Sequence, residues 1–318
     1  MTALRVFGAG VLILVMILLS RAVRAEADPA TLDYRLQARA LAPGVYVVEG
    51  ANGDFSRANG CNIINTGFVV GSEGVLVVNT GPSKRYGEQL RSLIARTTTL
   101  PVKQVLHLNL HPDYFLGNQA FADVPRAATA ATTEGMRDEA EAYESNLYRT
   151  CGDWMKGTEA LLPDRSVTAG PLVFAGRALE LHELKGHTAS DLVLVDRASG
   201  VVFAGGLIFV ERVPTTPHAE IDDWLASLEQ LAARPFKTMV PSHGPVVSDA
   251  RGIEQTRRYL RWLDGSFTQA AQRGMEMNDV LAQPVPNEFL GWAALDTEYP
   301  RNVVHLYPEY EARSLQRP

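Results

Sequence analysis

The chain has 318 residues, of which 46% are hydrophobic and 21% are charged. This balance is typical of a compact globular protein and excludes a largely disordered one. The formal net charge is -6. Because nucleic-acid-binding domains carry basic patches, no nucleic-acid partner is expected.

The first 25 residues have the pattern of a secretory signal peptide. Arg5 gives a positive start, 6–19 is an apolar run, and Ala25 offers a small residue for cleavage. An uncleaved anchor is the alternative, but the run is shorter than the roughly 20 residues of a spanning helix. We therefore expect a periplasmic or secreted protein with no stable membrane span after cleavage. Three arginines leave with the peptide, so the mature chain is more acidic.

The chain contains two cysteines, Cys61 and Cys151. An exported protein meets an oxidising compartment, where a disulfide between them can form. A pair of buried free thiols is the equally weighted alternative. Neither cysteine lies in a Cys-X-X-Cys spacing, so neither is expected to bind metal.

Short Val-rich segments predict the strands of the first half, and turn residues separate them. Strands are expected at 41–48, 62–70, 75–78 and 101–106, with a helix at 86–95. Residues 128–160 have mostly helical patterns and link this half to the next.

The second half repeats the same order. Strands are expected at 178–184, 192–196, 201–204 and 237–240, and helices at 221–233 and 253–272. Two similar halves, each a sheet with helices outside it, predict an α/β (α+β) fold, an αββα sandwich of two mixed sheets. The expected domains are a signal peptide at 1–25, the sandwich at 26–250 and a C-terminal helical extension at 251–318.

Three loops at predicted strand ends carry candidate metal ligands. They hold His111 with Asp113, then His187, and then His243. Loops that a rigid sheet fixes in place are suited to holding such ligands. Imidazole and carboxylate groups suit Zn²⁺, and an incomplete protein shell leaves a water that the metal can activate.

Each of these residues also has an ordinary structural explanation. Asp113 can cap a helix that begins near Tyr114. Taken alone, His187 or His243 is more often a surface or core residue than a metal ligand. The remaining histidines look structural or lack metal-type spacing, and they are His107, His182, His218 and His305.

The combination resembles the metallo-β-lactamase superfamily over roughly residues 40–250. Within it, the chain is most similar to the quinoprotein relay system zinc metallohydrolases. Matching segments occur at 80–83, 85–88, 111–113, 116–121, 157–159, 214–219, 240–245 and 301–308. This resemblance implies an exported protein associated with quinoprotein (PQQ-dependent) alcohol oxidation, with a periplasmic quinoprotein dehydrogenase system as a possible partner.

The resemblance also implies a binuclear zinc site. The first zinc would be held at the positions of Asn109, His111 and His187, and the second at those of Asp113, Tyr114 and His243. A bridging Asp would fall at Gly206 and a supporting Asp at Asn79. The chain therefore departs from the pattern at four positions, which are Asn79, Asn109, Tyr114 and Gly206.

These departures predict at most one zinc, because an amide is a poor zinc ligand and glycine supplies none. The metal would be held by His111, Asp113, His187 and His243, with Asp113 as the catalytic residue that orients the attacking water. Lactam, lactone and thioester substrates are all compatible with this zinc-dependent hydrolase. The alternative is a metal-free pseudoenzyme that binds a small molecule or a partner in the periplasm.

Overall fold

The computed structural model describes residues 31–316, so the expected signal peptide lies outside the described residues. The chain divides into a short unit, Met1–Leu32, and a compact unit, Asp33–Pro318, which is the subject of all that follows. Within residues 31–316, no helix has both the length and the apolar character needed to cross a membrane.

The first half of the compact unit forms a seven-stranded mixed sheet whose strands lie in sequence order. Its first four strands are antiparallel, and β4 to β7 are parallel. The strands are β1 (Arg39–Ala42), β2 (Val45–Val48), β3 (Thr66–Val70), β4 (Val75–Val78), β5 (Val102–Leu106), β6 (Arg126–Ala128) and β7 (Arg165–Ser166). The parallel β4 is a continuous apolar run buried on both faces, as expected for a strand covered from both sides.

The second half forms a five-stranded sheet in the order β12-β11-β10-β9-β8. All neighbours are antiparallel except the parallel pair β11 and β12. The strands are β8 (Gly170–Phe174), β9 (Arg177–Leu184), β10 (Asp191–Asp196), β11 (Val201–Phe203) and β12 (Thr238–Val240).

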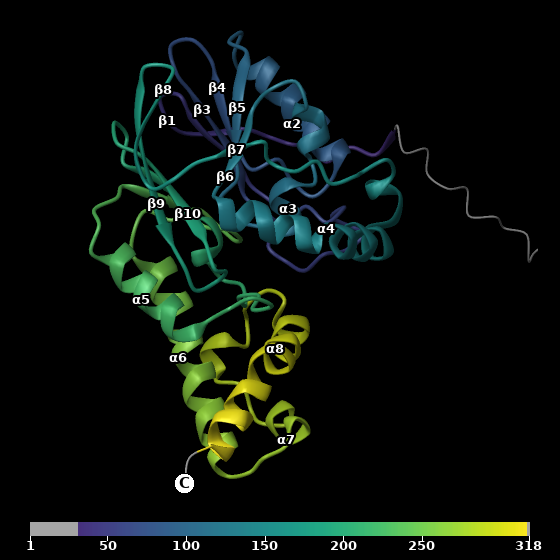
Figure 1. The fold of residues 1–318 in the computed structure, drawn as a ribbon, viewed down its shortest axis with the longest axis vertical. Coiled ribbons are helices and arrows are strands. Elements are labelled where there is room, and N and C mark those ends of the chain that lie inside the picture. Colours follow the sequence, from purple (N-terminus) through teal and green to yellow (C-terminus); the bar gives the residue numbers. More distant parts are fainter. Residues whose placement is uncertain (1–30, 317–318) are drawn as a thin grey trace, which may run out of the picture. The chain divides into compact units, whose positions relative to one another are not determined.

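Seven α-helices of the described residues flank the sheets or extend beyond them (Figure 1). They are α2 (Lys84–Thr97), α3 (Pro112–Phe115), α4 (Ala130–Cys151), α5 (Ile221–Ala232), α6 (Arg251–Gln272), α7 (Met277–Leu281) and α8 (Leu295–Leu315). Ser83 caps α2 by accepting from the Tyr86 amide, a role for which Ser is strongly preferred.

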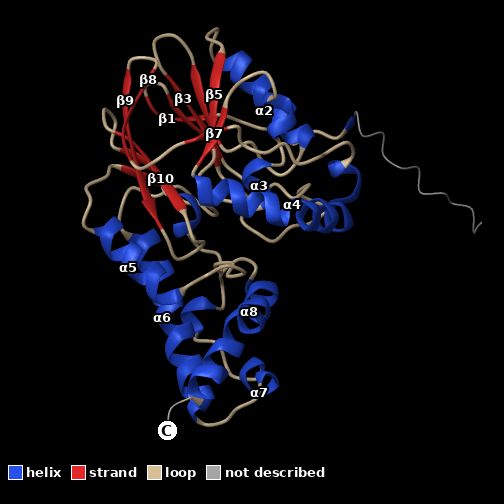
Figure 2. Cartoon of the chain, in the orientation of Figure 1, coloured by secondary structure: helices blue, strands red, loops and turns tan. Residues whose placement is uncertain are grey.

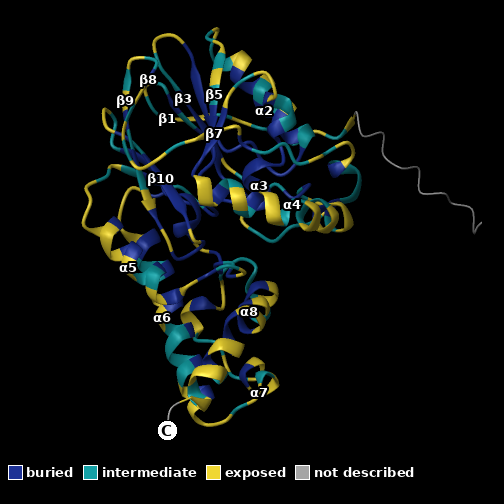
Figure 3. Cartoon of the chain, in the orientation of Figure 1, coloured by how far each residue is buried: buried dark blue, intermediate teal, exposed yellow. Residues whose placement is uncertain are grey.

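The two sheets pack face to face, and the helices lie outside them (Figure 2). Val69 and Leu106 from the first sheet share one core with Leu181 and Leu194 from the second. On the outer faces, α2 packs against the first sheet and α5 and α6 against the second. The expected αββα sandwich is therefore confirmed, and its buried residues concentrate between the layers (Figure 3).

The C-terminal helices share the core of the second sheet. Leu263 and Phe267 of α6 and Val303 and Tyr307 of α8 belong to the same buried cluster as Trp224 of α5. Residues 251–316 therefore add their apolar side chains to a core that begins in the sandwich.

The structure corrects the expected single strand at 41–48. Two strands, β1 and β2, form a tight antiparallel hairpin there instead. Gly44 makes the turn with a φ of +75°, a conformation that glycine adopts without steric cost, and Pro43 before it cannot donate to a ladder. Alternation across this segment was read as one strand because the hydrophobic pattern continues through the turn.

A disulfide joins Cys61 to Cys151, with 6.0 Å between their Cα atoms. Cys151 is the last residue of α4, and Cys61 lies in the loop before β3. The two possibilities left open by the sequence are thus resolved in favour of the bond. It encloses a long segment and fixes the loop against the end of the helix.

Candidate active site

The loop after β5 is positioned by hydrogen bonds from neighbouring strand ends. Asn79, directly after β4, accepts a hydrogen bond from the Leu108 amide at 3.0 Å. Asn109 then uses its side-chain oxygen to accept from the His111 amide, also at 3.0 Å. Pro112 begins the short helix α3, so His111 lies at its N-cap and Asp113 in its first turn.

The four predicted metal ligands come together at one end of the sandwich. The rings of His111 and His187 meet edge to face with 4.7 Å between centroids. On the other side, His243 Nε2 lies 3.7 Å from Asp113 Oδ2. All four residues are buried, with at most 8% of their surface exposed.

Asn109 faces the polar groups around it rather than presenting a ligand. Its Nδ2 donates to Asp191 Oδ1 at 2.5 Å and to Thr188 Oγ1 at 3.3 Å, and it lies 3.2 Å from His187 Nδ1. Its oxygen already accepts from the His111 amide. Both ends of this amide are therefore engaged within the protein.

The ring of His187 fills the space above Gly206. A Cβ placed on Gly206 would lie 1.9 Å from His187 Nδ1 and 2.8 Å from Asp191 Oδ1. His187 Nδ1 itself lies 3.2 Å from Asp191 Oδ1, within hydrogen-bond distance. A side chain at position 206 is thus excluded unless His187 moves.

Tyr114 packs as a structural residue. It is fully buried, and its hydroxyl pairs with Ser242 Oγ at 2.7 Å. Its backbone oxygen accepts from the Thr80 amide and from His107 Nδ1. Burial raises the pKa of the Tyr114 phenol well above its usual value, so the group stays protonated and remains a hydrogen-bonding partner.

Burial disfavours the charged forms of His111, His243 and Asp113. It lowers the pKa of His111 and of His243 well below the usual histidine value, and neighbouring charges add to the effect. It also raises the pKa of Asp113 to about 7. Near neutral pH the site therefore holds uncharged imidazoles and a carboxyl that is only partly ionised.

The structure adds a histidine that the sequence did not single out. His218 Nδ1 lies 3.1 Å from His111 Nε2, so the outward nitrogen of His111 already has a partner. On its other side, His218 Nε2 lies 3.7 Å from Glu139 of α4. His218 falls in the matched segment 214–219, which was the available signal, but its distance in sequence from His111 hid the contact.

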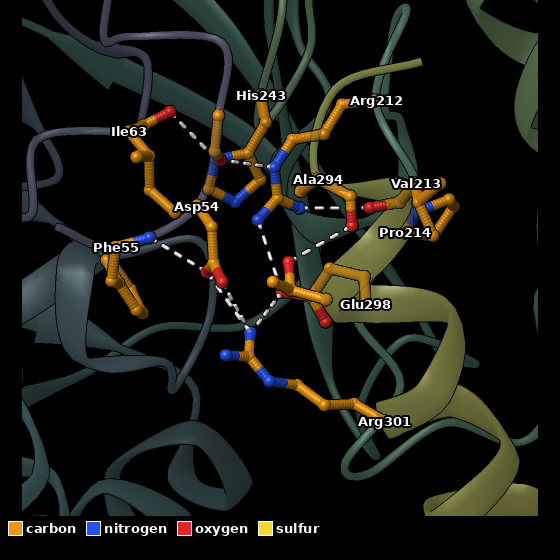
Figure 4. Close-up of polar contacts among 12 residues, drawn as sticks. Asp54, Phe55, Ile63, Arg212, Val213, Pro214, His243, Ala294, Glu298 and Arg301 are labelled. Atoms are coloured by element: carbon orange, nitrogen blue, oxygen red, sulfur yellow. Dashed lines mark hydrogen bonds and ion pairs between the residues drawn. The ribbon is translucent and has the colours of Figure 1, made fainter. Parts of the chain in front are cut away.

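A charged network with a buried pair, Arg212 and Glu298, at its centre lies beside His243 (Figure 4). Arg212 is fully buried and donates to the Gly53 and Val213 carbonyls, while its Nη2 lies 3.4 Å from Glu298 of α8. Arg301 contacts both Glu298 and Asp54, the latter in the loop that the disulfide holds. This network joins the C-terminal helix to two loops of the site.

Comparison with known proteins identifies the family of the chain. A family model described as the metallo-β-lactamase superfamily matches residues 59–243, which is more than half of the sequence. The chain belongs to the metallo-β-lactamase superfamily. A comparison with curated proteins gives no match.

Solved structures of metallo-β-lactamases share the fold. A metallo-β-lactamase from Pontibacter korlensis has 22% identity and a TM-score of 0.57, covering 71% of this chain and 99% of its own. The DIM-1 metallo-β-lactamase, exposed to ceftazidime, has 18% identity and a TM-score of 0.56, with coverages of 72% and 97%. One from Hirschia baltica has 15% identity and a TM-score of 0.55, with coverages of 71% and 97%. Identities this low support the fold alone.

The candidate donor atoms of this chain, as they lie in the structure, do not fit the zinc centre of the superfamily. Among residues 31–316, no group of three or more His, Cys, Asp or Glu side chains is arranged to hold a metal ion. His111 Nε2 faces His218, and His187 Nδ1 faces Asp191. Two buried atoms, Asp113 Oδ2 and His187 Nε2, have no hydrogen-bond partner among the described residues.

The predicted ligands therefore share one region without forming one coordination shell. Asp113 Oδ2 lies 3.7 Å from His243 Nε2, and His111 Nε2 faces His218. His187 directs its Nδ1 to Asp191, while its Nε2 has no partner. A structural zinc site normally has four protein ligands and a catalytic one three. This member of the metallo-β-lactamase superfamily retains the scaffold, but among residues 31–316 the donors do not form a metal-binding group as they lie.

Proposed function

We propose that this chain is an exported, metal-independent member of the metallo-β-lactamase superfamily, a pseudoenzyme that binds a small molecule or a protein partner. We further propose that it acts beside a periplasmic quinoprotein (PQQ-dependent) dehydrogenase. The observation that supports the loss of zinc chemistry best is the position of His187. Its ring occupies the space above Gly206, where the superfamily pattern has a bridging carboxylate.

Charge supports the same conclusion. Divalent zinc requires deprotonated ligands, and carboxylates at positions 79 and 206 would offset part of its charge. Here these positions hold Asn79, which binds the Leu108 amide, and Gly206. The remaining Asp113 has a pKa raised to about 7 by burial, so it offers only a partial charge near neutrality.

Export and the quinoprotein association rest on the sequence. The signal-peptide pattern at 1–25 supports export, and the Cys61–Cys151 disulfide is of the kind that persists in oxidising compartments. The association is supported by the matching segments, several of which build the site. One of them, 214–219, brings His218 to His111.

A mononuclear zinc hydrolase is the second candidate. It is favoured by the two unsatisfied atoms, Asp113 Oδ2 and His187 Nε2, and by the 3.7 Å between Asp113 and His243. When bound, a zinc ion would supply a Lewis acid and an activated water. For this function, His111 Nε2 would have to leave His218. His187 Nε2, which has no hydrogen-bond partner, would have to face the Asp113–His243 pair.

Zinc content distinguishes the two candidates. The mature protein is purified from the periplasm without chelator and compared with a restored variant carrying Asn79→Asp, Asn109→His, Tyr114→His and Gly206→Asp. We expect the natural chain to contain far less than one zinc per molecule, even after incubation with excess zinc. The restored variant serves as the positive control for uptake.

A zinc content near one per chain would overturn the proposal if it is lost in the His111→Ala and Asp113→Asn variants. In that case, chelator-sensitive hydrolysis of an ester or lactone panel would establish the second candidate. A pull-down from the periplasm tests the association separately. Recovery of a quinoprotein dehydrogenase with this protein supports it, and failure to recover a dehydrogenase that is expressed at a matched level contradicts it.

A further inference from the structure

A cavity of about 250 Å³ lies on the outer face of the five-stranded sheet. None of its lining residues belongs to the histidine site or to the charged network beside His243. Its volume is somewhat below the range of about 300–1,000 Å³ that is typical of pockets for drug-sized ligands. The cavity therefore suits a smaller molecule.

The floor of the cavity is aliphatic because of strand alternation. Val193 and Val195 are two residues apart on β10 and point to the same face, and Val202 is paired with Val195 across the β10–β11 ladder. The alternate residues Leu192 and Leu194 point inward to the core between the sheets. Of the three outward valines, Val193 and Val202 are buried and Val195 is partly exposed.

Helix α5 ends before it covers Val195 in full. Its last turn supplies Leu231, and the chain then turns through Pro235 and Phe236 into β12, where Met239 closes the wall. Phe236 is only partly buried although it packs on the same apolar cluster. Val195 and Phe236, which are both partly exposed, are thus left accessible between the end of the helix and the sheet.

The rim carries charge on both sides of this apolar floor. Glu180 and His182 stand on β9 opposite Val195 and Val193. Arg234, after α5, donates from Nη1 to His182 Nε2 at 3.2 Å.

Burial and the adjacent Arg234 lower the pKa of His182, so this ring stays neutral and acts as the acceptor. Arg197 lies on the other side, 3.8 Å from Glu180. Two guanidinium groups face one carboxylate, so the rim has an excess positive charge.

From this arrangement we propose that the cavity binds a small carboxylic acid with an apolar body, such as a medium-chain aliphatic acid. The apolar part would lie on the valine floor, and the carboxylate would reach the guanidinium of Arg234. Arginine presents a planar fork that matches a carboxylate, and such charge-assisted pairs are stronger than neutral hydrogen bonds. A cation would meet two arginines, and an uncharged ligand would gain nothing from the rim.

Calorimetric titration of the full mature chain with octanoate tests the proposal, with octylamine and octanol as matched probes of the same length. Arg234→Gln removes the rim charge at an exposed position and should weaken octanoate binding about tenfold, the equivalent of about 1.4 kcal/mol. Val195→Trp fills the cavity and should abolish binding. Arg96→Gln makes the same charge change on α2, against the other sheet, and should leave binding unaltered.

Saturable binding of octanoate that prefers the acid and responds to both cavity variants supports the site. Equal binding of octylamine, or octanoate binding that persists in Val195→Trp, would place any interaction elsewhere and overturn it. Lack of octanoate binding at millimolar concentration would overturn it as well. Thermal unfolding of each variant confirms that the fold is retained, and the result is independent of zinc content.

Discussion

Gly206 shows at the scale of one residue how the packing of this site differs from the zinc pattern of the superfamily. A missing side chain would ordinarily leave a void, and voids in protein interiors are destabilising. Here the ring of His187 fills the space and pairs with Asp191, while Asn109 donates to the same carboxylate. These three side chains therefore satisfy one another at His187 Nδ1, whereas His187 Nε2 has no hydrogen-bond partner.

This packing predicts that even the smallest side chain at position 206 is disruptive. Gly206→Ala places a methyl group 1.9 Å from His187 Nδ1, so the ring must move and its hydrogen bonds must break. We expect the free energy of unfolding to fall by about 1–3 kcal/mol, the usual cost of overpacking. Urea unfolding of the purified variant measures the loss.

Gly265→Ala is the matched control, because a Cβ there meets no atom within 4 Å. Position 265 lies inside α6, where alanine is favoured over glycine by up to about 1 kcal/mol, so this variant should be unchanged or more stable. Equal destabilisation by both substitutions would mean that the His187 packing is not the cause.

The residue types of the site could be read from the sequence, but their pairing could not. His111, Asp113, His187 and His243 were predicted at strand ends, and the structure places them in one region. Which atom each ring presents depends on partners distant in sequence, such as His218 for His111. The positions of the residues at strand ends indicate which loops meet. The orientation of each histidine ring depends on the side chains that pack around it.

At the scale of elements, the disulfide fixes the loop before β3 to the end of α4. Cys61 and Cys151 are separated by 90 residues in sequence, and their surroundings form a small apolar cluster with Leu110 and Phe115 of the site loop. The disulfide therefore stabilises the apolar cluster against which the His111 loop packs.

Strands were predicted correctly where hydrophobic and polar residues alternate or where the segment is continuously apolar. Short strands without a hydrophobic pattern were missed. The two-residue β7 has both residues exposed, and β6 begins with the buried Arg126. Arg126 is held by Asp164 and by the carbonyls that end η2 (Asn118–Phe121), so tertiary contacts create this strand. Such elements cannot be recognised from hydrophobic periodicity alone.

The disulfide leads to a prediction about reduction. Opening a bond that closes so long a loop restores entropy to the unfolded chain, which typically costs about 2–5 kcal/mol of stability. We expect dithiothreitol to lower the melting temperature of the natural chain. The Cys61→Ser/Cys151→Ser variant should melt at the reduced temperature and show no further response. A natural chain whose melting is insensitive to the reductant would argue against the bond.

At the scale of the whole compact unit, the C-terminal extension is joined to the sandwich by a buried ion pair. Arg212 lies in the segment between β11 and α5, and Glu298 lies in the first turn of α8. Burial lowers the pKa of Arg212 and raises that of Glu298, in each case against the attraction of the partner. Each charge is therefore tolerated in the interior largely because the other is present.

Removing one member of this pair is expected to lower the free energy of unfolding more than removing both. Glu298→Gln keeps the shape but leaves Arg212 buried without its main counter-charge, so we expect a loss of about 3 kcal/mol, at the low end for buried pairs. Asp54 moderates the effect because it also stabilises charged Arg212. The double variant Arg212→Met/Glu298→Met should recover much of the loss.

Glu288→Gln provides the control, since Glu288 pairs with Arg258 at the surface, where both side chains are about half exposed. Exposed pairs contribute roughly 0–1 kcal/mol, so this variant should unfold almost as the natural chain does. Urea unfolding of all four proteins separates the outcomes. If Glu298→Gln matched Glu288→Gln, the attachment of α8 would not depend on the buried ion pair. A larger loss that the double variant relieves would instead show that buried charge ties α8 to the loops around His243.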